Sequence, residues 1–125
     1  MTKESSFHVE TKPMRNRPEV PVLHVHGKVL FDDAPAFREK LLSEVARTRA
    51  STLVVDLGSV EKMSTAGAAV LVEGLAESRE HGLKMLLWAP SESVIQSFHL
   101  AGLDDALGAC CGWDEIDRRI QNIRD

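Results

Sequence analysis

The feature that most constrains the fold of this chain is an apolar run from Thr52 to Leu57. Such a run is typical of a strand in a sheet that is covered on both faces, which is the usual setting of parallel strands. A short polar segment follows it. A helix is then predicted to begin near Thr65 and to end at Gly82 in the C′ position. A buried strand that leads into a helix predicts a layered α/β architecture.

The rest of the chain continues this alternation. Further strands are predicted over Val20–His26, which ends at Gly27, and over Lys84–Trp88 and Ala109–Cys111. Helices are predicted to begin near residues 34, 65, 92 and 114, and Asp32 and Asp33 offer N-caps to the first of them. We therefore expect one α/β domain over residues 20–125, with a mixed, mostly parallel sheet of four to five strands flanked by about four helices. Residues 1–19 form an N-terminal extension in which Phe7–Glu10 could be an edge strand.

Composition argues against several classes of function. A net charge of −4 over 125 residues gives no basic field that would attract nucleic acid. The longest apolar run, Ala66–Val72, is far shorter than the roughly 20 residues that span a bilayer, and the N-terminus has no apolar signal segment. Cys110 and Cys111 are adjacent, which suits neither a disulfide framework nor a metal site, and we interpret them as buried thiols. We expect a cytoplasmic protein with no direct membrane insertion and no nucleic acid partner.

No catalytic or cofactor motif is present in the sequence. It lacks a phosphate-binding loop, a dinucleotide fingerprint and any histidine tied to a nucleophile, so a non-enzymatic protein without a cofactor is expected. His24 and His26 would share one face of a strand, but a pair without a third ligand is weak, and we expect no metal. Among the aromatic residues, Phe31, Trp88 and Trp113 are expected in the core or at its edge.

Asp56 lies near the end of the apolar strand, where a phosphorylated aspartate could lie. That interpretation needs a lysine after a late strand, and Leu87–Pro90 supplies none. We favour a structural role, in which the Asp56 carboxylate pairs with backbone N–H groups of the following turn.

Two adjacent hydroxyls, those of Ser64 and Thr65, precede or open the helix that follows. A helix start carries unpaired N–H groups and the positive end of the macrodipole, so a hydroxyl there suits a cap and also a phosphate. From the residue types alone, capping is the default. Ala66 and Gly67 make the helix start slim, which suits close packing on the sheet and also a surface open to a partner.

From Val20 to about Leu107 the sequence resembles the STAS family, the bacterial anti-sigma factor antagonists and their relatives. The resemblance rests on a strand that ends in Asp56-Leu57, followed by Met63-Ser64-Thr65-Ala66-Gly67. It extends over the helix up to Gly82, the strand Lys84–Trp88, and Val94 to Leu103.

The resemblance implies an anti-sigma factor antagonist that binds an ATP-binding anti-sigma factor kinase. Thr65 falls where the family carries its phosphorylated Ser or Thr, and Ser64 is the second choice. The implied partner-binding residues are Met63, Ser64, Thr65, Ala66, Gly67, Leu30, Asp32 and Asp33.

Two positions depart from the family pattern. Ser64 and Leu30 stand where the family usually has acids, and Asp32 or Asp33 could substitute in space. The alternative is a STAS subunit that is docked constitutively in a lipid-transport complex of the ABC type and is never phosphorylated.

Overall fold

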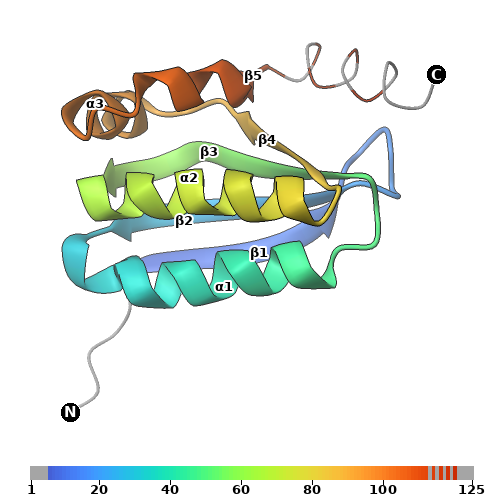
Figure 1. The fold of residues 1–125 in the computed structure, drawn as a ribbon, viewed down its shortest axis with the longest axis horizontal. Coiled ribbons are helices and arrows are strands. Elements are labelled where there is room, and N and C mark those ends of the chain that lie inside the picture. The colour runs from blue at the N-terminus through green and yellow to red at the C-terminus, as the bar shows by residue number, and fades with distance from the viewer. Residues whose placement is uncertain (1–5, 113, 115, 117, 119, 121–125) are drawn as a thin grey trace.

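The structure is a computed structural model that describes residues 6–112 together with residues 114, 116, 118 and 120 (Figure 1). In chain order its elements are β1 (Phe7–Pro13), β2 (Pro21–Val29), the 3-10 turn η1 (Phe31–Asp33), α1 (Ala34–Arg47), β3 (Thr52–Met63), α2 (Thr65–Glu80), β4 (Lys84–Trp88), α3 (Glu92–Leu100), the 3-10 helix η2 (Asp104–Ala109) and β5 (Cys110–Cys111). Residues 114, 116, 118 and 120 are also helical. No helix among these residues is long and apolar enough to cross a membrane.

The five strands form one sheet in the order β1-β2-β3-β4-β5. β1 is antiparallel to β2, and every later pair of neighbours is parallel. Figure 1 shows α1 and α2 side by side against the sheet, and α3 also packs against α2. The predicted α/β domain with a mixed, mostly parallel sheet is confirmed, and the described helices begin at or next to the predicted positions.

Two apolar clusters cover the two faces of the sheet. The larger one joins strand residues such as Leu53 and Val55 to Phe37 of α1 and Leu71 of α2. The smaller one, on the opposite face, contains Met14, Val20, Val22, Val54, Leu86, Ile116 and Ile120. Neighbouring residues of a strand point to opposite faces, so a strand buried on both sides must be apolar throughout.

Two strands continue further than the sequence predicted. β3 does not end at Leu57 but reaches Met63, and β2 passes Gly27 and ends at Val29. The extra residues pair with each other, with register shifts in β2 after His24 and after Gly27. Gly27 has a φ of +89°, and a Cβ there would lie 2.5 Å from a backbone oxygen of residue 6, so only glycine fits this bend. The segment before Ser64 is therefore a strand rather than a loop.

The edges of the domain differ from expectation in smaller ways. β1 is longer than Phe7–Glu10, and the last strand is confined to Cys110–Cys111 because a 3-10 helix precedes it. Cys110 is half-buried with a free thiol. Trp88 packs at the edge of the smaller apolar cluster. The aromatic residue Trp113 lies outside the described residues.

Phe31 is not a core residue as expected. Its side chain is 74% exposed in the turn between β2 and α1.

Candidate functional site

Ser64 and Thr65, the two adjacent hydroxyl residues, divide the roles that the sequence left open between them. Ser64 is the N-cap of α2, and its Oγ accepts a hydrogen bond from the backbone N–H of Gly67 at 3.1 Å. Thr65 is the first residue of the helix and is exposed. Among the residues that the structure describes, its hydroxyl has no hydrogen-bond partner. The Ser64 hydroxyl therefore satisfies the helix terminus, and the Thr65 hydroxyl is available to a partner.

The backbone before the cap is held by two other elements. The N–H of Met63 donates to Ser93 Oγ at 3.0 Å, and its carbonyl accepts a hydrogen bond from Ser97 Oγ. The N–H of Ser64 donates to the carbonyl of Val29 at 2.8 Å. The start of α2 is thus fixed both to α3 and to the end of β2, which gives Thr65 a defined position.

Gly67 allows the helix to lie close to the sheet. A Cβ on Gly67 would lie 3.0 Å from Val29 Cγ1 and 3.1 Å from Met63 Cγ, tighter than ordinary packing. Gly67 and Met63 are buried, although both were expected at a contact surface. Their role is to support the exposed residues from beneath.

The turn between β2 and α1 adjoins the start of α2, because η1 contacts α2. Leu30 and Phe31 are 40% and 74% exposed, and Asp32 is also exposed. We call these three residues together with Thr65 and the half-buried Ser64 and Ala66 the switch surface. Phe31 was missed as a surface residue because aromatic residues are expected in the core.

Asp33 cannot take the place of the missing acid. Its carboxylate accepts a hydrogen bond from the backbone N–H of Leu30 at 2.9 Å, and the residue is only 8% exposed. It is the N-cap of α1 by position, yet its side chain makes no capping hydrogen bond, contrary to expectation. Its carboxylate closes the turn of η1 instead. Asp33 therefore shapes the turn and is withdrawn from the exposed part of the surface.

Asp56 is a buried carboxylate with two partners. Its Oδ1 accepts a hydrogen bond from the N–H of Gly58 at 2.9 Å, and its Oδ2 lies 2.7 Å from Nδ1 of His24. The backbone contact has the form proposed from the sequence. The histidine contact was not foreseen, because it depends on the register that places His24 beside Asp56 in neighbouring strands.

The histidines of β1 and β2 lie in a row rather than around a centre. The ring centroids of His24 and His26 are 6.4 Å apart, those of His8 and His26 are 6.1 Å apart, and both pairs are stacked. His26 Nε2 lies 3.4 Å from a carboxylate oxygen of Glu10. Within the described part of the chain, no three His, Cys, Asp or Glu side chains are placed to hold a metal ion.

Comparison with known families places the chain. The STAS domain model matches residues 11–121, and the chain therefore belongs to the STAS domain family.

Solved structures of anti-sigma factor antagonists share this fold. One from Mycobacterium paratuberculosis is 22% identical, with full coverage of both chains and a TM-score of 0.67. RsbS from Moorella thermoacetica is 19% identical over 94% of this chain and 98% of its own, with a TM-score of 0.71. The anti-sigma factor antagonist SpoIIAA in its unphosphorylated form is 18% identical over 93% and 96%, with a TM-score of 0.66. At these identities the likeness shows the fold.

Proposed function

We propose that this protein is a non-enzymatic regulator of the anti-sigma factor antagonist type, which binds an ATP-binding anti-sigma factor kinase through the switch surface. The observation that carries the proposal is the exposed, unpartnered hydroxyl of Thr65 on the first residue of α2, beside a cap that Ser64 already supplies. Phosphorylation of Thr65 would then cost the helix no cap.

A phosphate on Thr65 would act differently on the fold and on the complex. Within the protein, negative charge at a helix start is favourable, so the fold should persist. In a complex, a group with a charge of about −1.5 to −2 would have to lose its water in the interface. Asp32 on the same surface adds like charge. Phosphorylation should therefore release the partner while the fold stays intact.

A second candidate is constitutive docking as a STAS subunit of an ABC-type lipid-transport complex. The exposed apolar side chains of Leu30 and Phe31 favour it, because they supply contact area that needs no switch. The burial of Asp33 favours it too, since the acid absent at Leu30 is not replaced by that residue.

The decisive experiment compares substitutions of Thr65 in binding to the anti-sigma factor kinase of the same organism. We expect Thr65→Ala to bind within about threefold of the unchanged protein, and Thr65→Glu to bind at least about tenfold more weakly, because a carboxylate must be desolvated and a methyl group need not be. Both variants should keep the native circular dichroism spectrum. Equal binding of Thr65→Glu and unchanged protein would reject the switch and favour constitutive docking.

A second variant tests the departure at Ser64. Asp is as good an N-cap as Ser, so Ser64→Asp should leave the start of α2 in place while it restores the acid usual in the family. We expect faster phosphate transfer from ATP to Thr65 by the kinase, measured by mass spectrometry of the modified peptide. Asn is also a good cap but carries no charge, so Ser64→Asn is the matched control. Phosphate found on Ser64 in the unchanged protein would contradict the assignment of Thr65.

A further inference from the structure

A cavity of about 410 Å³ lies on the other side of the molecule's architecture from the switch surface. It is formed by the end of β1, the loop that follows it and the first half of β2. Its lining residues Met14 and Val22 belong to the smaller apolar cluster, on the sheet face opposite α1 and α2. The cavity shares no residue with the switch surface, so its role is independent of the one proposed for Thr65.

The cavity combines an apolar floor with a cationic rim. Pro13, Met14 and Val22 supply the apolar part, and Lys12 and Arg15 are exposed at its edge. None of the described lining residues is acidic. Because the chain as a whole has a net charge of −4, a cavity lined by cations alone is a local exception that favours an anion.

The walls of the cavity are held in place by hydrogen bonds. In the loop, the N–H of Met14 donates to the carbonyl of Val20 at 2.8 Å, and the N–H of Val20 donates to the carbonyl of Arg17 at 2.9 Å. The ring of His24, which also lines the cavity, is fixed by the 2.7 Å contact of its Nδ1 with Asp56. A site built in advance loses less conformational entropy when a ligand binds.

The polar groups around the rim add to this selection. Asn16 offers amide donors and an acceptor beside Arg15. Lys12 Nζ lies 3.6 Å from a Glu10 carboxylate oxygen, an exposed pair that leaves the ammonium group in reach of a second anion. Arg15 is therefore the cation of the rim whose removal should matter most.

We propose that this cavity binds a small organic anion, with an apolar body against Met14 and Val22 and a carboxylate or phosphate head at Arg15 and Lys12. The floor accounts for the apolar body and the rim for the single charged end. Octanoate, octyl phosphate and octanol share the apolar chain and differ in the head, so they serve as probes. A preference between the two anions identifies the head group, and octanol measures the contribution of the chain alone.

The test is titration of the ¹⁵N-labelled protein by NMR with each probe. We expect saturable shifts of the amides of Met14, Arg15 and His24 with both anions at low millimolar concentration, and weaker binding of octanol. Arg15→Ala should raise the dissociation constant of the preferred anion by about fivefold, the effect of losing one exposed ion pair. Arg49→Ala is the control, because Arg49 is exposed near this end but does not line the cavity.

Three results would overturn the proposal. The first is the absence of saturable shifts with both anions. The second is octanol binding as tightly as the anions, which would leave the rim without a role. The third is Arg15→Ala binding as tightly as Arg49→Ala while the amide spectrum elsewhere stays native.

Discussion

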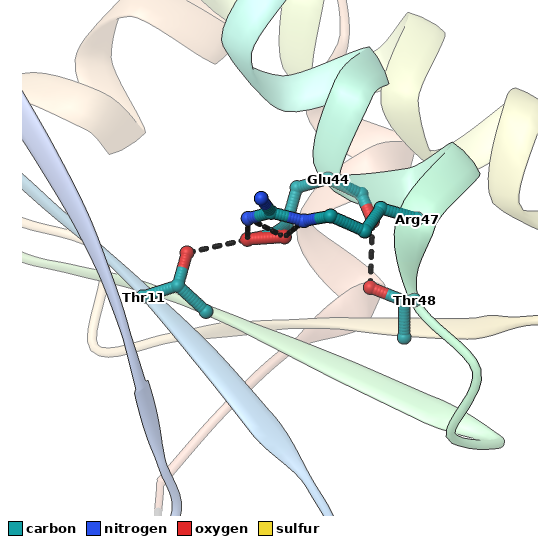
Figure 2. A network of polar contacts seen from close by, with 4 residues as sticks. All are labelled: Thr11, Glu44, Arg47 and Thr48. Atoms are coloured by element: carbon teal, nitrogen blue, oxygen red, sulfur yellow. Dashed lines mark hydrogen bonds and ion pairs between the residues drawn. The ribbon is translucent and has the colours of Figure 1, made fainter.

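The two ends of α1 adjoin two polar regions that are built in opposite ways. At its start, close to the start of α2, the Thr65 hydroxyl is exposed and unpartnered among the described residues. At its end, Glu44 is only 4% exposed, and its carboxylate accepts hydrogen bonds from Thr11 of β1 and from Arg47, whose Nη2 lies 2.7 Å away (Figure 2). Thr48 Oγ1 donates to the Glu44 carbonyl at 2.6 Å.

The difference separates a structural role from a contact role. Around Glu44 the polar groups use their hydrogen bonds inside the protein and tie the edge strand β1 to the end of α1. At the switch surface, Ser64 secures the helix and leaves its neighbour uncommitted. Substitutions near Glu44 should therefore change the free energy of unfolding, and substitutions of Thr65 should change binding and leave stability unaltered.

The largest effect on stability is expected for Glu44→Ala. It removes the acceptor of Thr11 and Arg47 from a buried position, and we expect the free energy of unfolding to fall by about 2 kcal/mol, measured by urea denaturation. Glu39 is an exposed glutamate on the same helix, so Glu39→Ala should stay within about 0.5 kcal/mol of the unchanged protein. Equal effects of the two substitutions would show that the Glu44 network does not hold β1.

The next effect sharpens the comparison within the switch surface itself. Ser64→Ala removes the cap of α2 and should cost about 1 kcal/mol. Thr65→Ala removes a hydroxyl with no described partner and should change stability by less than about 0.5 kcal/mol. Thermal unfolding of both variants checks this. A larger loss in Thr65→Ala than in Ser64→Ala would mean that the two hydroxyls exchange roles in solution.

The parts of the fold that depend on neighbouring residues could be predicted from the sequence. The helix that begins at Thr65 and ends before Gly82 follows from a cap, an apolar stripe and a glycine, which are all local signals. The extension of β3 to Met63 could not be predicted. It depends on pairing with β2 across two register shifts, which periodicity in a single strand does not encode.

The candidate site shows the same limit. The sequence placed two hydroxyls at a helix start, but which of them caps the helix depends on where the helix begins to within one residue. The contact of His24 with Asp56 and the inward turn of Asp33 depend on tertiary placement. The exposure of Phe31 goes against residue preference, and such exceptions are common where a protein meets a partner.

The smallest effect concerns Arg38 and Glu73, an ion pair that joins α1 to α2 between the two regions. Arg38 Nε and Nη2 donate to the Glu73 carboxylate at 2.8 and 2.6 Å, and the side chains are 54% and 40% exposed. The hydrogen bonds from Arg38 hold the pKa of Glu73 below its usual value. Because the pKa is lower in the folded than in the unfolded protein, the pair adds stability above the unfolded value of about 4.3, and this is lost as the pH falls through the folded value.

Solvent and salt screen so exposed a pair, so Glu73→Gln should affect stability less than either Glu44→Ala or Ser64→Ala. We expect a double-mutant cycle of Arg38→Gln and Glu73→Gln to give a small favourable coupling at pH 7. The coupling should shrink as added salt is raised and should vanish near pH 3, where Glu73 takes up a proton. A coupling that survives at pH 3 would show that α1 and α2 are held together at this point by packing of the two side-chain stems rather than by charge.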